Sequence, residues 1–167
     1  NIKYVNNDRY ESTNSMFSLL LTRTLTNDDI IVFDCDIVFE AELLMDLVKN
    51  HEKTCISIEF REDLNDEDYK IEIIGNKITK MGKKIPILPK ARYGESMAIN
   101  RFSKDDSKIL FEIMDSCIKK GIVNNFYEDA FMTLLEKTKV SLFEIKNRRI
   151  VEIDFPEDYE NAQSMNW

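Results

Sequence analysis

The sequence Ile30-Ile31-Val32-Phe33-Asp34-Cys35-Asp36 places four consecutive apolar residues directly before two aspartates. Such a run predicts a strand that is buried on both faces, as the strands of a parallel sheet are. Open α/β sheets bind their ligands at the carboxyl ends of such strands. We therefore expect residues 30–33 to lie centrally in a sheet that has helices on both faces.

The two aspartates that follow this run have two interpretations. A buried carboxylate without a partner is costly, and a divalent cation with a phosphate would offset that cost because hard cations prefer oxygen ligands. Alternatively, the strand ends in solvent and Asp34 and Asp36 are simply exposed. An Asp-x-Asp pattern alone does not decide between these alternatives.

Composition limits the class of protein. The chain has 167 residues, of which 43% are hydrophobic and 32% charged, as expected for one globular domain. Its net charge of −8 argues against a nucleic-acid partner. No apolar run approaches the ~20 residues of a membrane span, so we expect no membrane partner. Cys35, Cys55 and Cys117 follow no disulfide or metal spacing, which favours reduced thiols and a cytoplasmic location.

Apolar periodicity and capping residues predict the remaining elements. Strands are expected at 2–5, 30–33, 55–60, 69–74, 77–81, 96–102 and 140–145. Helices are expected after a cap at Thr13 or Asn14, at 41–50, after a cap at Ser103, at 128–137, and from Pro156. The predicted fold is α/β: one domain over residues 1–167, with a mixed, mainly parallel central sheet, helices on both faces and an antiparallel hairpin.

A second acidic cluster lies near the end of the chain, at Val151-Glu152-Ile153-Asp154-Phe155-Pro156-Glu157-Asp158. Asp154 precedes a proline that begins a helix, so it is either a helix N-cap or a metal ligand. Together with Asp36 it would supply two carboxylates from separate elements at one edge of the sheet. That pair is a minimal Mg²⁺ site, whose remaining positions water and phosphate oxygens would fill.

Several motifs occur in an order that resembles a known family. They are Thr13-Asn14-Ser15-Met16-Phe17-Ser18-Leu19, Asp36-Ile37-Val38-Phe39-Glu40, Gly94-Glu95-Ser96, Tyr127-Glu128-Asp129-Ala130 and residues 151–158. The chain resembles the nucleotidyltransferases that make nucleotide-diphospho sugars, and most of all the branch that acts on phosphocholine and related phospho-amines. The resemblance extends over nearly the whole chain, which would form the C-terminal two-thirds of the family domain.

This resemblance implies roles for particular residues. Asp36 and Asp154 would be catalytic and would hold Mg²⁺, and the Thr13-Asn14 turn would lie near the nucleotide. The acceptor side, which includes an insertion at residues 54–102, would be lined by Glu95, Tyr127, Glu128 and Asp129. The expected partners are a nucleoside triphosphate and a small phosphorylated acceptor.

Two features depart from the family pattern. The residue before the central aspartate, usually Gly, is Cys35 here. The Gly-rich loop with its Arg and Pro-Lys pair, which holds the triphosphate, has no counterpart in a sequence with only 4 glycines. We therefore expect the 167 residues alone to be catalytically inactive, and an unpaired strand edge to favour a homodimer.

The expected function is Mg²⁺-dependent transfer of a nucleoside monophosphate, CMP in the first instance, from a triphosphate to phosphocholine, another phospho-amine or a sugar phosphate, with release of pyrophosphate. One alternative is a phosphatase of the haloacid dehalogenase type, with Asp34 as nucleophile and Asp36 as general acid. The other is a degenerate domain that binds a nucleotide without turnover.

Overall fold

The structure is a computed structural model that describes residues 2–165 and 167. Over these residues it contains a seven-stranded sheet and a separate two-stranded sheet. The strands are β1 (Ile30–Phe33), β2 (Ile37–Phe39), β3 (Cys55–Glu59), β4 (Lys70–Ile74), β5 (Lys77–Gly82), β6 (Arg92–Ser96), β7 (Ile99–Phe102), β8 (Ser141–Glu144) and β9 (Ile150–Glu152). The α-helices are α1 (Ser15–Leu21), α2 (Ala41–Lys49), α3 (Lys104–Lys119), α4 (Phe131–Leu135) and α5 (Pro156–Ser164). Short 3₁₀ helices are η1 (Tyr10–Ser12), η2 (Thr22–Leu25) and η3 (Tyr127–Ala130).

The large sheet is mainly antiparallel, so the prediction of a mainly parallel sheet is wrong. Its strand order is β1-β7-β3-β6-β4-β5. Strand β8 is not part of this path and pairs with β3. Within the described residues, only the β3–β8 pair is parallel. The apolar runs indicated burial correctly, but burial on two faces does not fix strand direction. Here β6 extends the β4–β5 hairpin through an antiparallel pair with β4, and β7 pairs antiparallel with β1 and β3.

Strand β1 lies at an edge of this sheet rather than at its centre. It pairs antiparallel with β7, from Ile30 opposite Phe102 to Phe33 opposite Ile99, and its other edge is unpaired among the described residues. Its residues are half-buried, and Phe33 is 52% exposed. The predicted central position was therefore wrong. A free edge permits self-association, but the homodimer stays a prediction.

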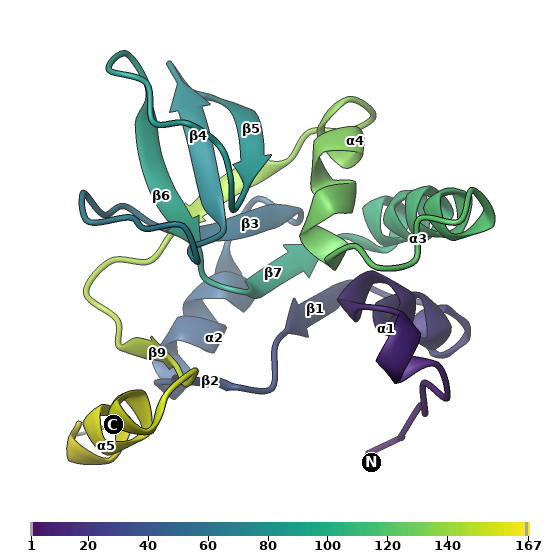
Figure 1. Cartoon of the computed structure of the whole chain (residues 1–167), viewed down its shortest axis with the longest axis horizontal. Helices are drawn as coiled ribbons and strands as arrows, with labels where there is room; N and C mark the ends of the chain where they lie inside the picture. Colours follow the sequence, from purple (N-terminus) through teal and green to yellow (C-terminus); the bar gives the residue numbers. More distant parts are fainter. Residues whose placement is uncertain (1, 166) are drawn as a thin grey trace.

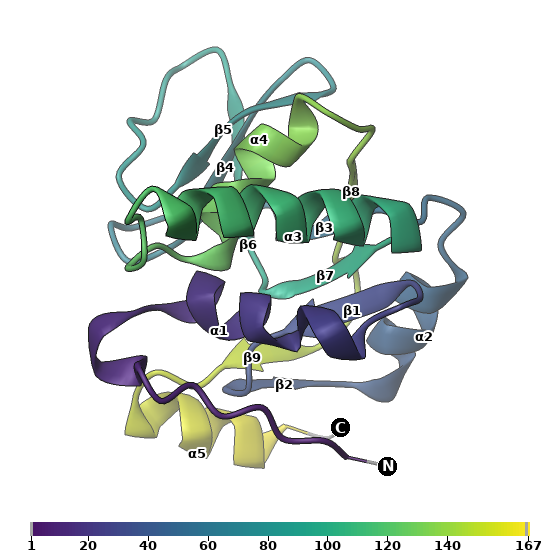
Figure 2. The same cartoon turned by 90° about the vertical axis from the view of Figure 1, so that its right-hand side faces the viewer.

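The predicted helices on both faces of the sheet are confirmed (Figure 1). Side chains of one strand alternate between two cores, since Ile56 of β3 belongs to one cluster and Cys55 to the other. The larger core packs under α1, α3 and α4, and the smaller packs under α2. Figure 2 shows α1 and α3 lying along one side of the molecule, and Figure 1 shows α5 at the opposite end of the molecule from α1.

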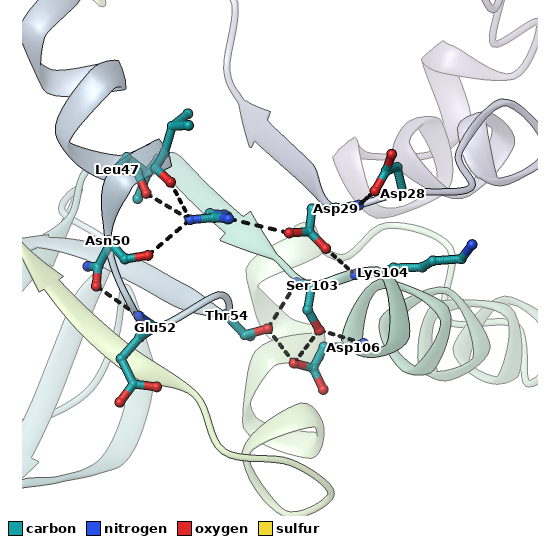
Figure 3. A network of polar contacts seen from close by, with 11 residues as sticks. Asp28, Asp29, Leu47, Asn50, Glu52, Thr54, Ser103, Lys104 and Asp106 are labelled. Carbon is teal, nitrogen blue, oxygen red and sulfur yellow. Dashed lines mark hydrogen bonds and ion pairs between the residues drawn. The ribbon is translucent and has the colours of Figure 1, made fainter.

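A polar network joins the elements around β1 at the end remote from Asp34 (Figure 3). The Arg101 guanidinium donates hydrogen bonds to the carbonyl oxygens of Leu47, Val48 and Asn50 at the end of α2. It also donates to Asp29 at 3.3 Å, and Asp29 accepts from the Lys104 backbone N–H at 3.0 Å. That last bond is the main cause of a lowered Asp29 pKa. The network thus fixes α2 and α3 relative to β1 and β7.

Most of the other expected elements occur, with three differences. Residues 2–5 form no strand, the expected strand at 96–102 is divided at Ala98, and the helix expected at 128–137 begins as η3. Ala98 has a positive φ of 49°, which interrupts the strand and separates β6 from β7. The β4–β5 hairpin is confirmed, with Gly75 at φ 63° in its turn. No helix among the described residues is long and apolar enough to cross a membrane.

Candidate functional site

The small β2–β9 sheet brings the two predicted metal ligands together. The strands are antiparallel, and Ile37 lies opposite Glu152. Asp36 immediately precedes β2, and its carbonyl oxygen accepts a hydrogen bond from the Ile153 N–H at 2.9 Å. The pairing therefore places Asp36, from one end of the chain, beside residues 152–154 from the other.

Three carboxylates meet at this point: those of Asp36, Glu152 and Asp154. Each contributes one oxygen to a group in which all three atoms lie within 4.8 Å of one another. Burial and, to a smaller extent, the negative charges of Asp154 and Asp36 together raise the pKa of Glu152 to about 7. Like charges held this close favour a bound cation, and oxygen-only ligand sets suit Mg²⁺.

Glu152 was not among the expected ligands, although the sequence contains a signal for it. Residues 151–154 alternate apolar and acidic, and alternating residues of an extended segment point to the same side. Asp154 is not the N-cap of α5, because Phe155 occupies that position; Asp158 lies in the first turn of the helix. Oδ2 of Asp158 accepts hydrogen bonds from the N–H groups of Asp154 at 3.2 Å and Phe155 at 2.9 Å.

A cavity of about 360 Å³ adjoins this group of carboxylates. Its lining contains one cationic side chain, Lys83, and seven acidic ones: Asp34, Glu67, Asp68, Glu95, Glu128, Glu152 and Asp154. Tyr69, Ser96, Phe126 and Phe155 also contribute to its walls. The cavity therefore has a strongly negative lining and the size of a site for a small molecule.

Glu95, an expected acceptor residue, lines the cavity and is only 8% exposed. Burial raises its pKa to about 7, against the opposing effect of Arg61. The Arg61 guanidinium lies 2.5 Å from the Glu95 carboxylate and 3.8 Å from that of Asp68. This ion pair connects the loop that follows β3 to strand β6, so Glu95 helps to form the cavity wall.

Glu128 lines the same cavity and is 6% exposed. Burial and, to a smaller extent, the nearby charge of Asp34 together raise its pKa to about 7. Burial also raises the pKa of Asp34, which the Tyr127 hydroxyl partly opposes. Tyr127 is 2% exposed, and its hydroxyl lies near these two carboxylates without forming a hydrogen bond of standard geometry. Tyr127 therefore lies behind the cavity wall.

Thr13, Asn14 and Asp129, which were also expected in the site, are not among the lining residues. Both carboxylate oxygens of Asp129 accept hydrogen bonds within the fold, from the Phe126 N–H at 3.1 Å and the Tyr69 hydroxyl at 2.9 Å. Asn14 caps α1, and its N–H donates to the Val123 carbonyl at 3.1 Å. The Thr13-Asn14 turn is thus held against the segment that leads into η3.

The raised pKa of Glu128 has a consequence for stability. An acid whose pKa rises from 4.5 unfolded to about 7 folded binds its proton more tightly in the folded state. Its contribution to stability is therefore lost as pH rises through that interval. We expect Glu128→Gln to be more stable than the parent chain at about pH 8, by roughly 1–3 kcal/mol, and similar to it near pH 5. Thermal unfolding across this pH range measures both; identical pH profiles would contradict the prediction.

The fold is that of the nucleotide-diphospho-sugar nucleotidyltransferases, as the resemblance in sequence implied. No protein-family model matches the chain, and no curated protein matches its sequence significantly. The evidence for the fold comes from solved structures that share 14–19% sequence identity with the chain.

Three of these structures show the range of relatives. The inositol-1-phosphate CTP transferase from T. maritima superposes with a TM-score of 0.69 at 19% identity, covering 92% of this chain and 60% of its own. The CTP:phosphocholine cytidylyltransferase from Streptococcus pneumoniae gives 0.67 at 19% identity, covering 94% and 65%. A UDP-glucose pyrophosphorylase gives 0.68 at 14% identity, covering 92% and 60%. The chain thus spans less than two thirds of the length of these proteins.

Proposed function

We propose that this chain carries the metal-binding and acceptor-binding part of a nucleotidyltransferase. The reaction would transfer CMP from CTP to a small phosphorylated acceptor and release pyrophosphate. The observation that carries this proposal is the convergence of Asp36, Glu152 and Asp154 beside an acidic cavity, in a fold shared with nucleotidyltransferases. The choice of CTP follows the two similar structures whose names specify it.

The three carboxylates fit Mg²⁺. Their donor atoms are all oxygens, and Mg²⁺ commonly uses one or two carboxylates while water and phosphate complete its coordination. When bound, the ion would neutralise charge on the reacting phosphates. Asp36, just before β2, and Asp154, just after β9, would hold it, and Glu152 would supply a third oxygen. These residues need form no covalent intermediate, because nucleotidyl transfer depends mainly on positioning and charge.

The acidic cavity would bind the acceptor, with Glu95 and Glu128 in its wall. We propose that residues 54–102 form the acceptor side, since β6 in this segment supplies Glu95 and Ser96 to the cavity lining. The Thr13-Asn14 turn would lie on the nucleotide side, as the resemblance implied. Its hydrogen bonds to the segment before η3 would couple that side to Tyr127 and Glu128.

The fold does not favour the phosphatase alternative. It also leaves Asp34 half-buried in the cavity wall, beside Tyr127 and the other acids. A domain that binds a nucleotide without turnover remains the second candidate. The convergence of the three carboxylates favours an enzyme over this second candidate.

We expect the 167-residue chain alone to release pyrophosphate from CTP, Mg²⁺ and phosphocholine far more slowly than ordinary enzymes. Backbone N–H groups and cations must hold a triphosphate, and the glycines at 75, 82, 94 and 121 form no Gly-rich loop. The assay compares this chain with any longer coding product that contains it. Mg²⁺-dependent transfer by the longer protein would support the proposed function, and its absence there would favour the non-enzymatic candidate. Ordinary rates from the 167 residues would contradict the expected inactivity.

A further inference from the structure

A second cavity, here called the hairpin cavity, shares no lining residue with the acidic cavity. It lies between the turn of the β4–β5 hairpin and residues 135–144, which include the end of α4 and strand β8 (Figure 1). Its volume of about 710 Å³ is within the usual range for small-molecule sites. Strand β6 contributes Arg92 to the hairpin cavity, whereas Glu95 points to the opposite face of that strand and lines the acidic cavity.

The floor of the hairpin cavity is an uncovered end of the larger core. Ile73, which is 3% exposed, belongs to that core, and Phe60 and Ile78 pack against it. Six apolar side chains line the cavity: Phe60, Ile73, Ile78, Leu135, Val140 and Leu142. An apolar body placed on this floor would be removed from water, which is favourable in proportion to the area that it covers.

The charged side chains of the lining are three cations and one acid: Arg92, Lys77, Lys139 and Glu144. The acid is already paired, since its carboxylate lies 2.8 Å from the Lys146 ammonium. Lys139 is paired as well, with Glu52 outside the cavity.

Arg92 and Lys77, in contrast, form no ion pair with any residue that the structure describes. In a chain with a net charge of −8, the hairpin cavity thus has two cations without an anionic partner. Its charge is complementary to an anion, whereas the acidic cavity repels one unless a metal ion is bound.

Arg92 is positioned where the apolar floor meets the charged side chains. Its guanidinium carbon lies 4.0 Å from the centroid of the Phe60 ring, a cation–π contact that holds the side chain against the floor. A guanidinium has five N–H donors in a planar arrangement that matches the oxygens of a carboxylate or a phosphate. An anionic group bound to Arg92 would therefore lie directly beside the apolar floor.

We propose that the hairpin cavity binds a small amphipathic anion. Its apolar body covers the floor, and its carboxylate or phosphate group binds Arg92 and Lys77. The two parts of the lining specify the two parts of the ligand, since a purely polar anion leaves the floor in contact with water and a neutral apolar molecule leaves the cations unpaired. The inference is independent of the proposed function, because no residue of the acidic cavity takes part in it.

Binding to the 167-residue chain, measured by calorimetry or NMR titration, tests the proposal. Mg²⁺ is left out so that no metal ion in the acidic cavity attracts an anion. The probes share one alkyl chain and differ in head group: decanoate, decyl phosphate, decanol and decyltrimethylammonium. We expect the two anions to bind at least about tenfold more tightly than the neutral and cationic probes, the effect of a hydrogen bond between charged groups. Octanoate, which is shorter by two CH₂ groups, should bind about tenfold more weakly than decanoate.

Two substitutions locate the anionic group. Arg92→Gln should weaken decanoate binding about tenfold and Lys77→Gln about threefold, and each should change decanol binding by less than about twofold. Both side chains are exposed, so both variants should fold. The matched control is Arg9→Gln, which changes another exposed arginine that lies over a phenylalanine ring, 5.0 Å from the centroid of Phe17 and outside the cavity. It should leave every affinity unchanged.

Each outcome supports or overturns the proposal. Tighter binding of decanoate indicates a ligand of the fatty-acid type, tighter binding of decyl phosphate indicates a lipid phosphate, and equal binding indicates recognition of negative charge alone; all three support it. Decanol or decyltrimethylammonium binding as tightly as decanoate would overturn the proposal, as would the absence of saturable binding by either anion. An unchanged affinity for decanoate in Arg92→Gln would show that the anion binds elsewhere, which also overturns it.

Discussion

Asp36→Asn and Asp154→Asn are each expected to abolish the response of this protein to Mg²⁺. In the parent chain, Mg²⁺ at a hundred times its dissociation constant should raise the free energy of unfolding by about 2.7 kcal/mol. Each variant lacks one of the three converging carboxylate oxygens, so we expect that increase to vanish. In a longer protein with transferase activity, turnover should fall at least about a hundredfold. Thermal unfolding with and without Mg²⁺, and pyrophosphate release, measure the two effects.

Without Mg²⁺, Asp36→Asn and Asp154→Asn should not lower the free energy of unfolding. Asp154 and Asp36 raise the pKa of Glu152, which shows that the three charges repel one another. Removing one charge relieves that repulsion, so neither variant should be less stable than the parent chain when Mg²⁺ is absent. Loss of the Mg²⁺ response without loss of stability is the signature of a ligand rather than of a structural residue.

Asp158→Ala is the matched control for Asp154→Asn. Asp158 lies in the first turn of α5, accepts hydrogen bonds from the N–H groups of Asp154 and Phe155, and is not one of the converging carboxylates. Its loss should therefore cost about 1 kcal/mol and leave the Mg²⁺ response intact. A normal Mg²⁺ response in both Asp36→Asn and Asp154→Asn would show that the ion does not bind here. That result would remove the main support for the proposed function.

The sequence predicted the pair Asp36 and Asp154 although it predicted the wrong sheet around them. We expected the two residues to meet at the carboxyl edge of a parallel sheet, whereas they meet because β2 and β9 form a separate antiparallel pair. Neither short strand was expected, because three residues are too few to show a period. The pairing of Asp36 with Asp154 was predicted from the order of motifs along the chain, and local periodicity did not indicate it.

For β1, the sequence predicted the strand correctly but not its position in the sheet. Residues 30–33 were correctly predicted as a strand from their apolar character. Hydrophobicity does not distinguish a central strand from an edge strand whose side chains pack on only one neighbour, and Phe33 proved half-exposed. Likewise, the interior of the acidic cavity depends on contacts between distant residues, such as Arg61 with Glu95, which no local pattern encodes.

Gly94→Ala is expected to be the most destabilising of the conservative substitutions considered for this chain. Gly94 lies in β6 between β3 and β4, opposite Ile71. A Cβ atom there would lie 2.5 Å from the Glu59 carbonyl oxygen and 2.6 Å from Cγ1 of Ile58. Both contacts are far inside van der Waals distance, and the first is with backbone that cannot rotate away. We expect a loss of about 3 kcal/mol, measured by chemical denaturation.

Gly75→Ala separates this steric effect from the general cost of replacing a glycine. Gly75 has a φ of 63° in the hairpin turn, and nothing lies within 4 Å of the site of its Cβ. Its replacement should cost only about 1 kcal/mol, from backbone conformation alone. Equal losses in the two variants would show that β3 can move away from β6.

If β3 cannot move, Gly94→Ala must displace β6, the strand that carries Glu95 and Ser96. Ligand binding in the acidic cavity should then weaken even under conditions where the variant is fully folded. The close approach at Gly94 would in that case hold two residues of the cavity wall in place, which gives the motif Gly94-Glu95-Ser96 a physical reason for its first residue.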